Sequence, residues 1–190
     1  MILPQLRSAT AHLHERVERA VDPLGRLGSV EAYASLLERY YGFYQPFEQR
    51  LREAAGAVPI NLNLAPRLKA PLLRSDLSAL GRSDEAIEAL PLCDTLPTPS
   101  GPDEVFGCLY VLEGATLGGQ IIRKQIERDH GLVAARGGSF FSGYGDAVGP
   151  MWKAFCAALE DYARQHPETE HVVVGAAVET FTCFEQWFGG

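Results

Sequence analysis

Apolar side chains recur at steps of three and four residues along most of this 190-residue chain, and this helical period constrains its fold most strongly. It predicts helices at about 4–20, 30–55, 67–80, 83–90, 102–129, 150–164 and 168–187, joined by connections rich in Pro and Gly. Only the run "HVVVG" at 171–175 has the composition of a strand. The sequence therefore predicts an all-α helical bundle.

Length and composition favour a single globular domain over residues 1–190. The apolar fraction is 46% and the charged fraction 22%, as in ordinary globular proteins. The net charge is -7 and the 17 basic residues are scattered, which argues against nucleic acid as a partner. Because no stretch of about 18 apolar residues occurs and the N-terminal segment becomes charged early, we expect a cytoplasmic protein without a membrane partner.

Motifs of several enzyme classes are absent. The sequence has no His-Glu-x-x-His, no Gly-x-Ser-x-Gly and no phosphate-binding Gly-rich loop that continues into Lys-Ser/Thr. Its four cysteines, Cys93, Cys108, Cys156 and Cys183, are widely separated and lack the spacing of a zinc site. In a reducing compartment we expect them to be free thiols, mostly buried.

The first predicted helix carries a possible metal ligand, His14. At about 100° per residue, His14 lies within roughly 20° of Arg7, and Glu18 lies about 40° further round, so the three share a face beside the apolar stripe. A carboxylate one turn after a histidine can orient a metal-ligating imidazole. The alternative is an ordinary His/Glu pair on a half-buried face. His12 faces elsewhere and has no acid four residues later.

A second feature is the run "LEGATLGGQ" at 112–120, inside a strongly helical pattern. A glycine in a helix interior costs about 1 kcal/mol relative to alanine, so Gly114, Gly118 and Gly119 require an explanation. Gly114 and Gly118 are four residues apart and could present bare backbone to a large, flat molecule. Close helix packing through small residues is the alternative.

Two aromatic segments remain open in interpretation. One predicted helix has an aromatic surface, formed by Tyr40, Tyr41, Phe43, Tyr44 and Phe47. These side chains belong either to the core or to the wall of a site for a flat ligand. The run "SFFSGYG" at 139–145 contains glycines and hydroxyls but no nucleophile-base pair, and it is predicted to be a loop.

Taken together, two segments resemble the haem oxygenase family. "LRSATAHLHERVE" at 6–18 is similar to that family's proximal helix, with a threonine four residues before the histidine and a glutamate four after it. "YVLEGATLGGQIIRK" at 110–124 is similar to its distal helix, where glycines let the backbone kink over the haem. The segments "YVLEG" and "FFSGYG" look most like the bacterial branch associated with phytochromes.

The resemblance implies a bundle that holds haem, as cofactor and substrate, between the first helix and a glycine-kinked distal helix. His14 is then the axial iron ligand, with Glu18 as its partner and Arg7 at a propionate, while Gly114, Gly118 and Gly119 lie against the ring. With O2 and electrons from a ferredoxin or a flavoprotein reductase, such a protein opens haem to biliverdin, CO and iron. A biliverdin-binding photoreceptor is a possible acceptor of the product, and a non-catalytic haem-binding or haem-sequestering protein is the alternative.

Two departures from the family pattern affect these expectations. Mammalian-type members have an aspartate directly after the first distal glycine, where this chain has Ala115, so Thr116, Gln120 or ordered water must supply the proton path. The helix at 152–164 also lacks a dense basic surface and retains only Lys153 and Arg164. Arg7 is therefore the one predicted propionate contact.

Overall fold

The structure is a computed structural model that describes residues 1–57 and 60–190, and every regular element in those residues is helical. The α-helices are α1 (Ile2–Val21), α2 (Val30–Ala57), α3 (Ala70–Ala79), α4 (Asp84–Glu88), α5 (Pro102–His130), α6 (Ser139–Ser142), α7 (Val148–Gln165) and α8 (Glu170–Gly189). Short 3-10 turns lie at Ala65–Arg67, Ala134–Arg136, Gly145–Ala147 and Pro167–Thr169. The prediction of an all-α fold is confirmed.

Two predicted boundaries were wrong because distant carboxylates determine where helices begin. The helix predicted at 67–80 starts at Ala70, since Glu48 Oε1 accepts a hydrogen bond from Lys69 N (2.5 Å) and Oε2 accepts one from Ala70 N (3.0 Å). The "SFFSGYG" segment, predicted as a loop, contains α6. Buried Asp76 accepts hydrogen bonds from the backbone N–H groups of the first two α6 residues (2.8 and 2.7 Å).

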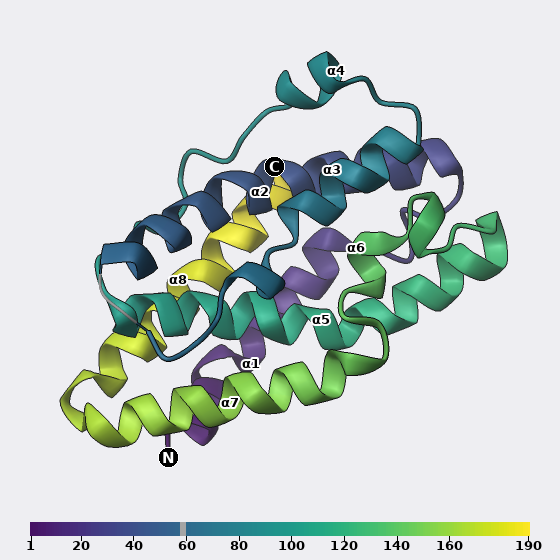
Figure 1. The fold of residues 1–190 in the computed structure, drawn as a ribbon. Helices are drawn as coiled ribbons and strands as arrows, with labels where there is room; N and C mark the ends of the chain where they lie inside the picture. Colours follow the sequence, from purple (N-terminus) through teal and green to yellow (C-terminus); the bar gives the residue numbers. More distant parts are fainter. Residues whose placement is uncertain (58–59) are drawn as a thin grey trace.

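The centre of the fold is α8, which packs along both α1 and α5 (Figure 1). On α5, a Cβ added at Gly107 would lie 2.3 Å from Val173 O, so this glycine allows α5 and α8 to approach closely. Val173 belongs to the strand-like run "HVVVG", which is helical in α8. In Figure 1, α7 lies along one edge of the molecule, and α2 with α3 along the opposite edge.

Helix α2 continues through Pro46, and the missing proline N–H has a structural use. The carbonyl of Gly42, four residues earlier, accepts a hydrogen bond from Cys93 N (2.9 Å). A Cβ at Gly42 would lie 2.3 Å from Pro91 O. Glycine and proline at this spacing therefore attach the segment after α4 to the middle of α2.

The apolar helix α5 belongs to the core. By length and composition it could cross a membrane, but 61% of its most apolar window is buried inside the molecule. Its N-terminus begins with Pro102, and Gly131 ends it with φ 66°, a left-handed conformation that glycine adopts easily. Consistent with the prediction for the cysteines, all four are free thiols; Cys93, Cys108 and Cys183 are buried.

Two alanine substitutions in α5 are expected to change stability in opposite directions. Gly107→Ala forces a methyl group against Val173 O and should lower the free energy of unfolding by about 1–3 kcal/mol. Gly118→Ala, where no atom lies within 4 Å of the added Cβ, should raise it by up to about 1 kcal/mol through helix propensity. Urea unfolding of the ligand-free protein measures both, and equal effects would contradict the close contact at Gly107.

Candidate functional site

A cavity of about 890 Å³ lies between α1 and the middle of α5. Helix α8 contributes Phe181 and Phe184 to its lining, and α2, α6 and α7 complete the walls. Nearly all the site residues predicted from the sequence line it, namely Arg7, His14, Glu18, Gly114, Thr116, Gly118 and Gly119. The structure therefore brings together segments that are about 100 residues apart in the chain.

On the α1 wall, His14 is held between an aromatic ring and a carboxylate. Its ring meets that of Phe181 edge-on, with centroids 6.0 Å apart, and its Nδ1 lies 3.6 Å from Glu18 Oε1. This leaves Nε2 as the nitrogen on the far side of the ring from Glu18. The control residue His12 is outside the cavity lining. Of the two histidines on α1, only His14 can present a nitrogen to a molecule in the cavity.

The charges along α1 divide the cavity into a basic end and an acidic end. Arg7 lies at one end, and Glu15, Glu18 and Asp22 lie towards the other. The rise of an α-helix places Arg7 and Asp22 about 22 Å apart. In the described part of the chain, no carboxylate lies within 4.0 Å of the Arg7 guanidinium. An anionic ligand group would be attracted to the Arg7 end and repelled from the other.

Tyr110, on the α5 wall, belongs to the basic end of the cavity. Burial raises the pKa of its phenol, while the Thr10 hydroxyl and the positive charge of Arg7 act in the opposite direction. Tyr110 therefore remains a neutral hydrogen-bond donor close to Arg7. The sequence analysis did not single it out, although it lies four residues before Gly114.

The glycines of α5 have different surroundings. No atom lies within 4 Å of a Cβ built on Gly118, and one on Gly114 would touch only the Trp152 ring, at 3.9 Å. A Cβ on Gly119 would lie 3.3 Å from Phe141 O. Close helix packing thus accounts for Gly119 in part, but it does not account for Gly118, whose bare backbone borders the cavity.

The two polar residues predicted for a proton path are placed differently. Thr116 lines the cavity, and its Oγ1 donates a hydrogen bond to Glu113 O (2.6 Å). Gln120 lies outside the lining; its Nε2 donates to Ser142 O (3.3 Å) and its Oε1 accepts from Arg123 Nε (3.2 Å). The structure therefore does not bring Gln120 into the site.

The aromatic run of α2 contributes to both the core and the cavity. Tyr40 and Tyr44 line the cavity, whereas Phe43 and Phe47 are fully buried in the core. The two phenylalanines of α6, residues 140–141, join the lining, and the Tyr40 ring centroid is 4.8 Å from that of the first. Both interpretations of the run were therefore partly right.

A buried charged cluster beside α5 was missed by the sequence analysis. Glu113 is 2% exposed, and its two carboxylate oxygens accept hydrogen bonds from Arg67 Nη1 (2.5 Å) and the Tyr144 hydroxyl (2.6 Å). Lys69 Nζ lies 3.7 Å from the centre of the Tyr144 ring and donates to Arg67 O (2.8 Å). One available sign was a glutamate in the otherwise uncharged run at 105–122 of a core helix, because a buried charge requires partners.

The basic residues expected on α7 do not contribute to the cavity. Lys153 and Arg164 are both exposed and lie outside its lining, and Arg164 pairs with Asp161 on the same helix. Arg7 and Lys69 are therefore the cations of the lining, and Lys69 comes from the segment before α3.

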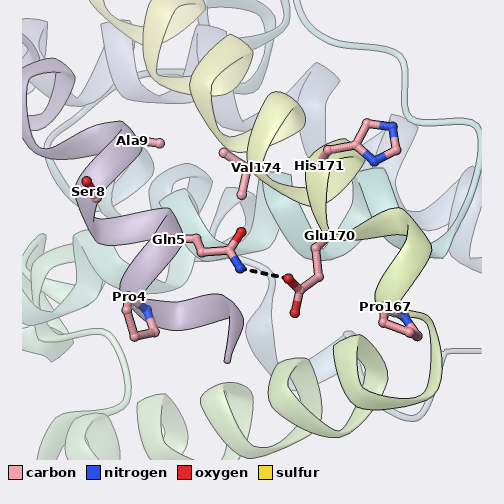
Figure 2. A pocket seen from close by; sticks show the side chains of 8 residues that line it. All are labelled: Pro4, Gln5, Ser8, Ala9, Pro167, Glu170, His171 and Val174. Atoms are coloured by element: carbon pink, nitrogen blue, oxygen red, sulfur yellow. Dashed lines mark hydrogen bonds between the residues drawn. The ribbon is translucent and has the colours of Figure 1, made fainter.

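A second hollow, of about 820 Å³, lies on the surface between α1 and the start of α8. Figure 2 shows its polar side chains, with Gln5 Nε2 donating to Glu170 Oε2 (2.7 Å) and the His171 ring turned away from that bond. His171 ends one of two Glu-x-x-His runs, at 127–130 and 168–171. Within residues 1–57 and 60–190, no group of three His, Cys, Asp or Glu side chains could hold a metal ion, so neither run forms a metal centre by itself.

Removing the buried charge at 113 should destabilise the fold. Glu113→Gln leaves the Arg67 guanidinium without its counter-ion and should cost about 3 kcal/mol, because a lone buried charge is strongly unfavourable. The matched control is Glu127→Gln, which breaks a half-exposed pair with Arg123 on the same helix and should cost under about 0.5 kcal/mol. Denaturant unfolding compares them, and similar costs would mean that the 67–113 pair is not buried in solution.

Comparison with known proteins gives a consistent family. The family model described as "Heme oxygenase" matches residues 2–189. A heme oxygenase of Xanthomonas campestris pv. campestris is 28% identical over 148 residues, which cover 77% of this chain and 82% of that protein. The structure of a heme oxygenase from Leptospira interrogans superposes with a TM-score of 0.78 at 18% identity, covering 99% of this chain and 98% of the other, and so shares the fold. The chain belongs to the haem oxygenase family.

Proposed function

We propose that this chain, as one domain of residues 1–190, binds haem as its substrate between α1 and α5 and opens the ring to biliverdin, CO and iron. The observation that carries the proposal is the pairing of His14 on one wall with the bare backbone at Gly118 on the facing wall, across a largely apolar cavity. The volume, about 890 Å³, falls within the range of cofactor sites. A porphyrin needs such a broad, flat space together with one nitrogen ligand.

His14 is the proposed axial ligand of the haem iron. Its Nε2 is available for coordination, while the Glu18 carboxylate, 3.6 Å from Nδ1, lies where it can orient the ring. A neutral histidine ligand pushes less electron density towards O–O cleavage than a cysteinate does, which suits ring opening. Bound haem supplies the iron that activates O2 and the carbon that is oxidised. The protein has to orient the ring, exclude bulk water and deliver protons.

The charge distribution along α1 orients the substrate. We expect the propionates to lie at the basic end, where Arg7 offers a guanidinium and Tyr110 a neutral phenol. The opposite edge of the ring would face Glu18 and Asp22, where a carboxylate would be repelled. Gly114 and Gly118 allow the backbone of α5 to approach the face of the ring opposite His14, because glycine has no side chain to intervene there.

The wider setting follows from the family resemblance. The reaction consumes O2 and electrons, for which a ferredoxin or a flavoprotein reductase is the proposed donor. Biliverdin is the proposed product, and the resemblance of "YVLEG" and "FFSGYG" to the phytochrome-associated branch makes a biliverdin-binding photoreceptor the proposed acceptor. We place the reaction in the cytoplasm.

A non-catalytic haem-binding protein is the second candidate, and Ala115 is the observation that favours it, since this position offers no acid to the cavity. One experiment separates the two functions. The protein is loaded with haemin, and ascorbate or a ferredoxin reductase system is added in air. Decay of the Soret band with growth of biliverdin absorbance supports the oxygenase. A stable Soret band under turnover conditions supports the carrier.

Replacing the proposed ligand should abolish the histidine-haem spectrum. His14→Ala removes the only histidine in the cavity lining, so we expect haemin titration to give the spectrum of non-specifically bound haem and an affinity at least about 10-fold weaker. His12→Ala is the matched control on the same helix and should leave the spectrum unchanged. An unaltered Soret band in the His14→Ala protein would refute the assignment.

A further inference from the structure

The polar groups of the cavity are distributed unevenly between its walls. Arg7, Glu15 and Glu18 lie on α1 and Asp22 directly follows it, whereas α5 contributes no charged side chain to the described lining. Helix α2 contributes Tyr40 and Tyr44, and the segment before α3 contributes Lys69. Among the described residues of the lining, Lys69 is therefore the charged side chain that belongs neither to α1 nor to its end at Asp22.

Lys69 is held firmly in place. The residue is 3% exposed, its backbone N–H donates to Glu48 Oε1, and its Nζ donates to Arg67 O (2.8 Å). The Nζ also lies 3.7 Å from the centre of the Tyr144 ring, a cation–π contact. An ammonium group has three N–H donors, so these two contacts leave one N–H without a hydrogen-bond partner among the described residues, in a residue that lines the cavity.

The surroundings of Lys69 adjust its protonation. Burial lowers the pKa of the ammonium to about 8; the carboxylates of Glu113 and Glu48 oppose that shift, and the charge of Arg67 adds to it. The nearby phenol of Tyr44 has its pKa raised well above its usual range by burial and by neighbouring carboxylates, so it stays neutral. A lysine of this kind is protonated near neutral pH and can still release a proton.

We propose that Lys69, on the segment before α3, is a proton donor of the cavity and takes the part for which Ala115 has no acid. This inference rests on the proposed function. In the transfer, one Nζ–H bond breaks as an O–H bond forms on the oxygen or water molecule that lies against the ammonium, and the neutral amine regains its proton from cavity water. Glu113, Arg67 and Tyr144 act as positioning residues, because they fix the ammonium without touching the substrate.

The ionisation of Lys69 can be measured without haem. The chain has three lysines, and the other two, Lys124 and Lys153, are exposed and serve as internal references. Trace acetylation with acetic anhydride between about pH 6 and 11, followed by peptide mass spectrometry, gives a titration curve for each lysine. We expect the Lys69 midpoint at about 8, below both references. A Lys69 curve that coincides with those of the references would overturn the proposal.

The donor role is tested with two variants loaded with haemin. Lys69→Arg keeps the positive charge but cannot release a proton near pH 8, whereas Lys69→Met keeps a similar length without charge. Both should bind haemin with a midpoint within about twofold of the parent protein, and both should lose about 100-fold in turnover. Lys124→Arg is the matched control and should turn over normally. Turnover of the parent protein should fall as the pH rises through about 8, because the donor loses its proton.

The outcomes separate this inference from the proposed function. A Lys69→Arg protein with parental rate and pH profile would show that Lys69 is only a structural cation. If Lys69→Arg and Lys69→Met bind haemin normally but are inactive, the donor role is supported. If the parent protein itself binds no haem, the proposed function fails and the donor role fails with it, whatever the acetylation curve of Lys69.

Discussion

The packing of α8 against both α1 and α5 is the constraint on which the site depends. Gly107 allows α5 to lie so close to α8 that a methyl group would meet the backbone at Val173, and α1 rests on another part of the same helix. Both walls of the cavity are therefore anchored on α8. This arrangement leaves the cavity open between His14 and Gly118 without any loss of core packing.

The glycines of α5 illustrate how one residue type serves different physical purposes in a single helix. Gly107 is required by helix packing, Gly119 is partly required by the approach of α6, and Gly118 meets nothing in the protein. Glycine at position 118 costs the helix about 1 kcal/mol relative to alanine, and packing does not explain that cost. The adjoining cavity provides a reason for it.

The helical period and the local geometry of each helix could be predicted from the sequence. The shared face of Arg7, His14 and Glu18 needs only the twist of a helix, and the three residues do line one cavity. The capping of α3 by Glu48 could not be predicted, because it joins segments 21 residues apart through a side chain. The partners of the buried Glu113 could not be predicted either, since they come from two other segments of the chain.

Gln120 was wrongly expected in the site for the same reason, because its contacts come from other parts of the structure. A helical wheel places a residue on a face, but it does not say which neighbour occupies that face, and here Ser142 and Arg123 engage the amide. The aromatic run of α2 shows the converse, because one helix can supply both a core and a cavity wall. Long-range contacts decide whether a helix face lies in the core or in a cavity wall. The family resemblance indicated the α1 and α5 walls, but it did not indicate that Lys69 also lines the cavity.

The position of the iron in crystals grown with haemin tests the central claim most directly, because its anomalous scattering locates the metal independently of the surrounding structure. The account predicts one iron between α1 and α5, bonded to Nε2 of His14, with the propionates towards Arg7 and the ring plane against Gly118. Iron bonded to another residue, or haem seated in the surface hollow beside His171, would contradict it.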